Sequence, residues 1–140
     1  MSAWPRGMPA VGDRARRSRR VTADDIVAFT AISGDRNPLH YDEAAAAASR
    51  FGEIVVQGGV SSAILNAVVA EDLPGPGTVF LELNLRFLAP VRPGDDITGE
   101  VTVTDVREDK PITRLDVAVT RGDGVRAIEG AAVCYTVALP

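Results

Sequence analysis

Alternating hydrophobic and polar residues fill the second half of the chain. The alternation recurs in four segments, at residues 79–87, 101–103, 115–119 and about 126–137. A period of two places every second side chain on one face, so each segment is predicted to be a half-buried strand. In the first of these strands the expected apolar face consists of alternate residues, namely Val79, Leu81, Leu83, Leu85 and Phe87.

Short turn sequences at Glu108–Pro111 and Gly122–Gly124 separate the later strands. Connections as short as these join antiparallel neighbours, because parallel strands need a long crossover. We therefore expect an antiparallel meander that the last strand completes.

The first half of the chain has the spacing of helices. Thr22–Asp25 resembles a capping box, and apolar residues then follow at nearly helical spacing, which predicts a helix from about Ala23 to Ser33. Asp42 and Glu43 precede an alanine run at 44–48, which predicts a second, short helix with His40 at its entrance.

Residues 60–70 are apolar nearly all round, and a helix without a polar face is expected to be buried on every side. One long buried helix and a curved antiparallel sheet make an α+β domain in which the sheet wraps the helix, the arrangement called a hot dog. The chain has 140 residues with 46% hydrophobic content, enough for one compact core and too few for two. Residues 1–140 are therefore expected to form a single domain.

The formal net charge of −4 argues against a nucleic-acid partner, because duplex-binding proteins usually carry a basic face. Arginines nevertheless crowd the N-terminal segment, at Arg14, Arg16, Arg17, Arg19 and Arg20. They either meet the phosphates of a nucleotide-bearing substrate or keep an edge strand solvated, and we favour the edge strand.

Cys134 is the only cysteine and lies in an apolar run, so it is expected to be a core residue of a cytoplasmic protein. Residues 1–20 contain no continuous apolar stretch, so neither a signal peptide nor a membrane span is expected. The sequence has neither clustered Cys and His residues nor a glycine-rich dinucleotide fingerprint, so we expect no metal and no redox cofactor.

The only histidine, His40, follows Asp35 by five residues, across a turn that contains Gly34, Asn37 and Pro38. Such a turn cannot continue a helix, so it can hold the carboxylate and the imidazole at fixed angles towards one cavity, as an acid/base pair requires. The alternative is that Gly-Asp-x-Asn-Pro is ordinary turn chemistry and that Asp35 caps the next helix.

The Asp35/His40 segment resembles the hydratase motif of the MaoC-like family. Three further segments resemble that family in the same order: Ile54–Gly59, Arg86–Asp95 and Arg107–Ile112. The whole chain is most similar to the R-specific enoyl-CoA hydratases of polyhydroxyalkanoate synthesis. The resemblance implies a homodimer that acts on an enoyl-CoA or enoyl-acyl-carrier-protein thioester, with Asp35 and His40 as the catalytic residues and Asn37 in a supporting position.

Gly58 matches the oxyanion-hole glycine of the family. Free N–H groups at a helix N-terminus attract negative charge, and Gly58 and Gly59 leave room for a carbonyl to approach them, although two glycines also suit a tight turn. The family commonly has histidine where this chain has Gln57. Ser62 and Asn66 share one helix stripe with Gly58, and the resemblance implies that Asn66 orients the catalytic carboxylate, unless it bonds a neighbouring backbone group.

Adding water to a trans-2-enoyl thioester needs a base near C3, an acid near C2 and donors for the thioester oxygen. Asp35, His40 and the helix N-terminus match these three requirements. Two competing functions remain open. A thioesterase of the same fold would cleave the thioester, and a non-catalytic acyl-thioester-binding protein would hold the ligand in a pocket without needing the pair.

Overall fold

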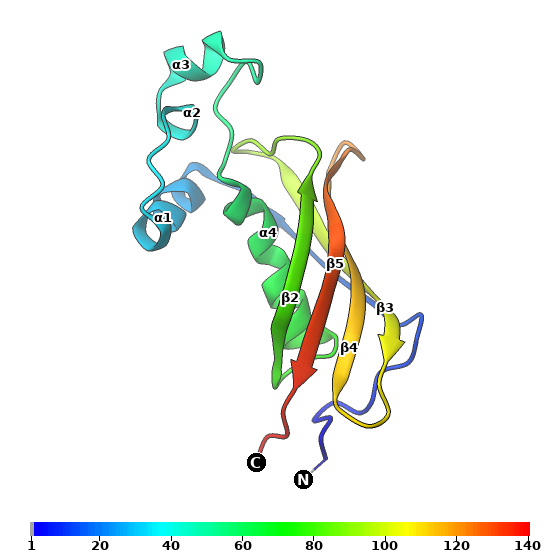
Figure 1. Ribbon diagram of the computed structural model, residues 1–140. Helices are drawn as coiled ribbons and strands as arrows, with labels where there is room; N and C mark the ends of the chain where they lie inside the picture. The colour runs from blue at the N-terminus through cyan, green and yellow to red at the C-terminus, as the bar shows by residue number, and fades with distance from the viewer. Residues whose placement is uncertain (1) are drawn as a thin grey trace.

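The computed structural model describes residues 2–140 and consists of a five-stranded antiparallel sheet curved around one helix (Figure 1). The strands are β1 (Arg14–Arg20), β2 (Thr78–Phe87), β3 (Asp96–Val106), β4 (Ile112–Arg121) and β5 (Arg126–Thr136). The helices are α1 (Ala23–Ser33), α2 (Pro38–Tyr41), α3 (Glu43–Ala48) and α4 (Gly58–Ala67), and the π-helical turn η1 (Val68–Asp72) continues α4. The α+β hot-dog prediction is confirmed.

The strand order is β1-β3-β4-β5-β2, so the expected meander is only partly correct. The two predicted short turns do join β3, β4 and β5, but β2 lies at the far edge beside β5 and not beside β3. The connection from β2 to β3 therefore crosses the end of the sheet. Its Val91 is buried, and the Val91 carbonyl accepts the Val56 N–H over 2.9 Å just before α4 begins.

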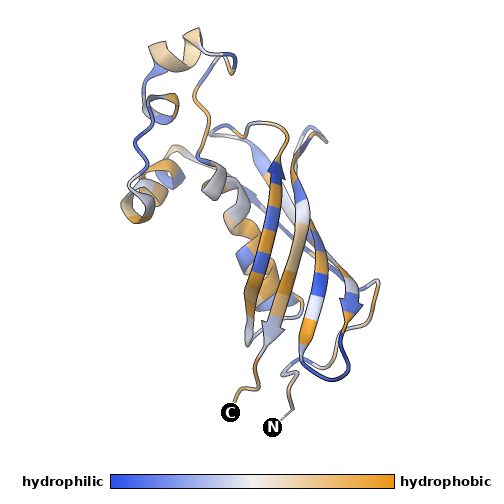
Figure 2. Ribbon diagram, in the orientation of Figure 1, coloured by the Kyte–Doolittle hydropathy of each residue, from blue (hydrophilic) through white to orange (hydrophobic). Residues whose placement is uncertain are grey.

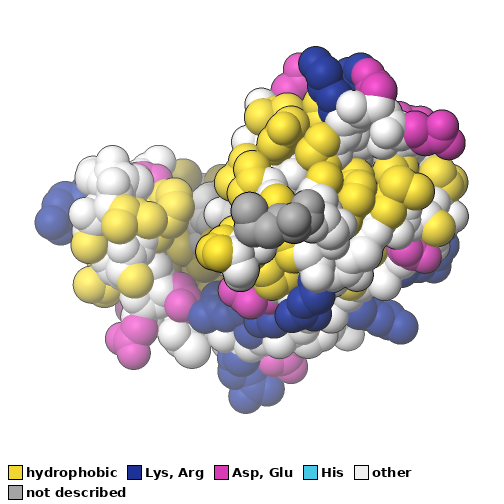
Figure 3. Space-filling view, turned by 90° about the horizontal axis from the view of Figure 1, so that it is seen from below, with side chains coloured by type: hydrophobic (Ala, Val, Ile, Leu, Met, Phe, Trp, Pro, Cys, Tyr) yellow, Lys and Arg dark blue, Asp and Glu magenta, His cyan; other side chains and the backbone are white. Residues whose placement is uncertain are grey.

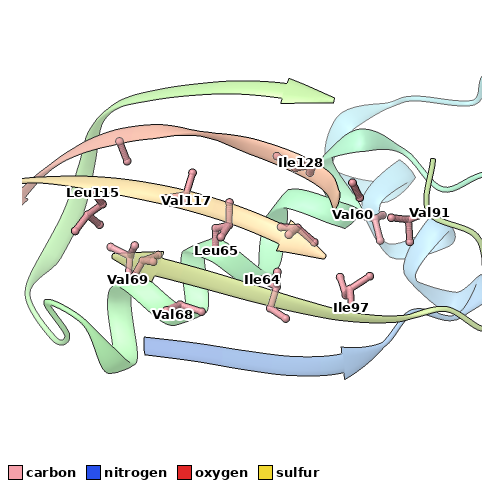
Figure 4. Packing of buried hydrophobic residues seen from close by; sticks show 14 of the residues in the cluster. Val60, Ile64, Leu65, Val68, Val69, Val91, Ile97, Leu115, Val117 and Ile128 are labelled. Carbon is pink, nitrogen blue, oxygen red and sulfur yellow. The ribbon is translucent and has the colours of Figure 1, made fainter. Parts of the chain in front are cut away.

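The core lies between α4 and the concave face of the sheet (Figure 4). Ile64, Leu65 and Val68 point from the helical segment towards the strands, which present apolar residues at alternate positions. The expected alternation of β3 and β4 is confirmed, because the buried residues of these strands fall on alternate positions, namely Ile97, Gly99, Val101, Val103, Thr113, Leu115, Val117 and Val119. The predicted burial of Cys134 is confirmed as well.

A β-bulge at Leu81 changes which side chains of β2 face the core. Phe80 pairs with Cys134 and Glu82 with Val133, so Leu81 is an extra residue with no partner on β5. An extra residue reverses the alternation, and both Phe80 and Leu85 consequently pack against the core. The single apolar face expected from Val79 onwards is therefore wrong for most of the strand: Val79, Leu81, Leu83 and Phe87 are exposed, and only Leu85 of the expected residues packs against the core.

One stripe of α4 is exposed, which corrects the expectation of a helix buried on every side. Gly58, Ala63 and Asn66 are exposed, and Ser62 is half-buried. The sequence pattern concealed this face because glycine and alanine count as neither polar nor strongly apolar. Glycine has no side chain and alanine only a methyl group, so these residues leave one face of α4 uncovered.

α1, α2 and α3 form an arm beyond the N-terminal end of α4 (Figure 1). The capping box is present, with the Thr22 N–H donating to Asp25 Oδ2 over 2.8 Å, and Gly34 ends α1 in the left-handed conformation at φ 77°. The Phe29 ring anchors the arm by lying against the Gly59 backbone. A Cβ on Gly59 would lie 2.0 Å from Phe29 Cζ, so only glycine permits this contact.

The two edges of the sheet differ in character. β1 carries the arginines at the predicted edge position, and three of them pair with acidic residues of the same chain, as Arg17–Asp72, Arg19–Asp25 and Arg20–Asp96. β2 is banded with hydrophobic residues (Figure 2), and Leu81 is 55% exposed. Seen from the end where the termini lie, Lys and Arg side chains gather along the lower flank and hydrophobic side chains above them (Figure 3).

Candidate active site

The arm brings Asp35 and His40 together. His40 Nε2 lies 3.5 Å from Asp35 Oδ2, and the side chains are 10% and 37% exposed, respectively. On the other side of the ring, Nδ1 lies 2.6 Å from the carbonyl oxygen of Val55. Because a carbonyl only accepts, Nδ1 must carry the hydrogen, and in the neutral ring Nε2 then presents its lone pair towards the carboxylate.

The turn between the two residues is held by its own hydrogen bonds. Asp35 Oδ1 accepts the Asn37 N–H over 3.0 Å, and Asn37 Oδ1 accepts the Leu39 N–H over 3.1 Å. Asn37 thereby caps α2, and Pro38 occupies its first turn. His40 lies inside this separate helix of one turn, whereas we expected it at the entrance of the alanine-rich helix. The sequence signal for α2 is the pair Asn37-Pro38, which caps and begins this helix and does more than form a turn.

His40 lines two hollows in the surface. The larger, about 640 Å³, lies between α1, α2 and the segment around Glu53 and Arg92. The smaller, about 330 Å³, is lined by His40, Gly58, Phe87 and mostly apolar residues of the 88–91 segment. We assign the smaller hollow as the candidate site, since it brings the imidazole and the first residue of α4 to one space.

Gly58 begins α4 and lines that hollow. As first residues of the helix, Gly58 and Gly59 have N–H groups that cannot bond within it, and they carry the partial positive charge of the helix N-terminus. A Cβ on Gly58 would lie 2.9 Å from Phe87 Cε1, so the aromatic ring closes one side of the glycine. The site thus has one free helix end facing an apolar wall.

Ser62 and Asn66 are not brought to Asp35 within this chain. Ser62 Oγ donates to the Gly59 carbonyl over 3.4 Å, and the Asn66 side chain is exposed on the open stripe of α4. The role of Asn66 towards the Asp35 carboxylate stays a prediction, because no hydrogen bond joins Asn66 to Asp35 within residues 2–140.

Sequence reasoning missed the residues that support the pair. Thr30 Oγ1 lies 2.8 Å from the Asp35 carbonyl oxygen, beside the hydroxyl of Tyr41, and Gln57 Nε2 lies 3.2 Å from the same Thr30 oxygen. Thr30 looked like an ordinary core position of a helix, and Tyr41 carried no local signal. Gln57 was noticed only as a departure from a family pattern.

Across residues 2–140, no three His, Cys, Asp or Glu side chains lie together as a metal site would require. In the same range, every helix is too short or too polar to span a bilayer.

Comparison with known proteins adds close relatives. The (R)-specific enoyl-CoA hydratase of Aeromonas caviae is 42% identical over 123 residues, which cover 88% of this chain and 92% of that protein. The 3-hydroxybutyryl-CoA dehydratase of Methylorubrum extorquens is 36% identical over 76% of this chain and 68% of that protein. The solved structure of the A. caviae (R)-hydratase, described as involved in PHA biosynthesis, superimposes with a TM-score of 0.87 and 40% identity, covering 91% of this chain and 97% of that one.

The family model described as "MaoC like domain" matches residues 9–124, a span that includes the arm, α4 and the sheet through β4. With its sheet-wrapped helix, its Asp35/His40 pair and these relatives, the chain belongs to the MaoC-like domain family.

Proposed function

We propose that this protein is a hydro-lyase that adds water to trans-2-enoyl-CoA to give (R)-3-hydroxyacyl-CoA, and catalyses the reverse dehydration. The observation that carries the proposal is the 3.5 Å approach of His40 Nε2 to Asp35 Oδ2, with His40, though not Asp35, lining the same hollow as Gly58. The names of the A. caviae and M. extorquens relatives support this reaction, and the name of the A. caviae relative supports its R stereochemistry.

The pair can activate water because Val55 fixes the imidazole tautomer. With Nδ1–H donating to the Val55 carbonyl, Nε2 and the Asp35 carboxylate are both acceptors, and a water molecule between them can donate one hydrogen to each. As the water oxygen attacks C3, one acceptor takes its proton. A proton then goes to C2 from the same pair, so hydroxyl and hydrogen add to the same face of the double bond.

Negative charge develops on the thioester oxygen when C3 is attacked. The N–H of Gly58 offers a donor that is already oriented, in a hollow whose apolar lining lowers the local dielectric constant. The first turn of α4 adds the positive end of its dipole. Gly58 is therefore proposed as the oxyanion-binding residue.

Asp35→Asn tests the proposal. The substitution keeps the size of the side chain but removes its charge, so we expect hydration to slow by about 10²–10⁴-fold, the usual contribution of one general acid or base. Enoyl-CoA binding should change little. Asp24→Asn removes the same charge from an exposed position of α1 and should keep wild-type turnover. A wild-type rate in Asp35→Asn would refute the proposal.

Product analysis separates the remaining alternatives. An R-specific 3-hydroxyacyl-CoA dehydrogenase should consume the product and an S-specific one should not. Release of free thiol without formation of a 3-hydroxyacyl thioester would indicate a thioesterase, and tight binding without turnover would indicate an acyl-thioester-binding protein. Enoyl-acyl-carrier-protein assayed beside enoyl-CoA would decide the carrier, for which we propose CoA. We propose the cytoplasm as the compartment, in keeping with the single buried thiol of Cys134.

We also propose a homodimer in which β2 of one protomer pairs with β2 of the other. β2 is an edge strand with exposed Val79, Leu81 and Leu83, whereas β1 at the opposite edge carries charges that discourage pairing. A two-fold axis at β2 would join both sheets into one. Light scattering should give the dimer mass for the wild type and a lower mass for Leu81→Lys, and a monomeric wild type at micromolar concentration would contradict the proposal.

A further inference from the structure

A single hydroxyl connects three parts of the site. Thr30, on α1, is 5% exposed, and its Oγ1 lies 2.8 Å from the Asp35 carbonyl oxygen and 3.2 Å from Gln57 Nε2. The Tyr41 hydroxyl contacts the same oxygen. Asp35 belongs to the dyad, Tyr41 follows His40 directly in α2, and Gln57 immediately precedes Gly58.

Hydrogen-bond valence fixes the direction of these bonds. A threonine hydroxyl has one hydrogen to donate and two lone pairs to accept with. Gln57 Nε2 can only donate, and its other hydrogen goes to the Ile26 carbonyl at 3.1 Å. The bonds at the Thr30 hydroxyl are mutually compatible if Thr30 accepts from Gln57 and Tyr41 and donates to the Asp35 carbonyl, which is nearer than the Ile26 carbonyl at 3.0 Å.

The Gln57 side chain is the fixed end of this arrangement. It is 1% exposed, and both of its N–H hydrogens bind α1, at the Ile26 carbonyl and at the Thr30 hydroxyl. Because Gln57 is the N-cap residue of α4, these bonds tie α1 to the start of α4. Its Oε1 is buried and has no hydrogen-bond partner within residues 2–140. An unpaired buried amide oxygen costs free energy, so what Gln57 contributes at this position are the two bonds that Nε2 donates to α1.

We propose that Thr30, held by Gln57, is a positioning residue that sets the distances among Asp35, His40 and the N-terminus of α4. The proposal rests on the proposed hydratase function. Thr30 and Gln57 do not touch the substrate, and they act by preventing the turn at Asp35, the helix that carries His40 and the Gly58 backbone from shifting independently. Misplacement of reacting groups by about 1 Å can lower a rate by roughly 10²-fold.

Thr30→Val and Thr30→Ser form the central test. Valine keeps the shape but removes the hydroxyl, and we expect kcat to fall by about 10- to 10²-fold while KM changes less than about threefold, since the displaced groups are catalytic and not substrate-binding. Serine restores the hydroxyl and should recover kcat to within about threefold of the wild type. A Thr30→Val protein that melts earlier but keeps full kcat below its transition would overturn the proposal.

Tyr41→Phe and Gln57→Met keep the test decisive if valine at position 30 prevents folding. Tyr41 is partly exposed, so its loss should be tolerated, and we expect a several-fold fall in kcat. Gln57→Met removes both donors together with the unpaired oxygen and should lower kcat more than it lowers stability. Combined with Thr30→Val it should add little, because residues that act as a unit are not additive. Full kcat in both single variants would overturn the proposal.

The single histidine supplies a readout independent of turnover. Because His40 is the only imidazole in the chain, ¹⁵N-labelled histidine gives one unambiguous pair of ring signals. The wild type should show the Nδ1-protonated tautomer imposed by Val55, and Thr30→Val should show averaging between tautomers. An unchanged tautomer in Thr30→Val would count against the positioning role. If Asp35→Asn keeps wild-type turnover, the hydratase proposal fails, whereas a slow Asp35→Asn beside a fast Thr30→Val defeats only the present inference.

Discussion

The arm of α1, α2 and α3 and the body formed by α4 and the sheet are held in place by different forces. In the body, apolar side chains such as Leu65, Val101 and Leu115 are fully buried against one another. In the arm, Ile26, Thr30 and Ala46 are the buried residues of its three helices, the Phe29 ring packs on Gly59, and hydrogen bonds hold the turn at Asp35 and the His40 ring. Apolar burial is strong but undirected, whereas hydrogen bonds are weaker and set angles. The arm is therefore suited to precision and the body to stability.

The largest expected effect is on the arm's chemistry. His40→Gln should reduce hydration by about 10²–10⁴-fold. The His40 side chain is 10% exposed and Nδ1 bonds the Val55 carbonyl, but a glutamine amide can donate to the same carbonyl, so the melting transition should fall only slightly. The double variant with Asp35→Asn should be little slower than either single variant, because the two groups share one water and one proton. Multiplicative losses in steady-state assays would mean that the residues act in separate steps.

Gly58 lies where the arm meets the body, and a bulky residue there should affect rate before stability. Gly58→Val places a side chain within reach of the Phe87 ring and over the N–H proposed to bind the oxyanion. We expect turnover to fall by about 10²-fold, as when one oxyanion donor is lost. Stopped assays at saturating substrate would measure this loss, and near-normal turnover would remove Gly58 from the mechanism.

Leu65→Ala tests the body. Leu65 is fully buried on α4, and truncation of a buried leucine should lower the free energy of unfolding by about 2–5 kcal/mol. Turnover per folded molecule should stay near that of the wild type below the transition. Leu65→Met, which keeps the volume, should cost less than about 1.5 kcal/mol. Urea denaturation measures both, and a large fall in kcat at constant folded fraction would show that the two regions are not separable.

Cys134 gives the smallest expected effect. Burial raises the pKa of its thiol from 9.0 to about 12, so the folded protein should resist thiol reagents at pH 8 and become reactive only on unfolding. The unfolded thiol ionises above about pH 9 while the folded thiol does not, so this group should reduce stability as the pH rises from about 9 towards 12. Rapid labelling of the native protein would show that the body opens as readily as the arm.

Local patterns predicted the elements and the sheet-wrapped helix, but not the order of the strands in the sheet. The bounds of α1 and the buried faces of β3 and β4 follow from periodicity and capping, which neighbouring residues determine. The position of β2 beside β5 depends on where a proline-containing connection crosses, and no local pattern encodes it.

The site divides in the same way. Asp35 and His40 are five residues apart, so their approach could be predicted from the turn between them. Gln57 and Thr30 are 27 positions apart, and each is unremarkable in its own segment. Their hydrogen bond forms where α1 meets the start of α4, at the contact of Phe29 with the Gly59 backbone.

The bulge at Leu81 has a consequence at the other end of its strand. Because of the extra residue, the core-facing positions change from even-numbered residues such as Phe80 to odd-numbered residues such as Leu85. Phe87 is also odd-numbered, so it lies on the same face as Leu85, and its ring turns towards Gly58. Without the bulge, Phe80 and Phe87 could not both face α4, because they are seven positions apart and a regular strand places such residues on opposite faces. Deleting Leu81 would leave the pairing of Phe80 with Cys134 and of Glu82 with Val133 unchanged, so both aromatic rings should keep their faces in a strand without a bulge. One extra residue in an edge strand thus decides which side chain forms this wall of the candidate active site.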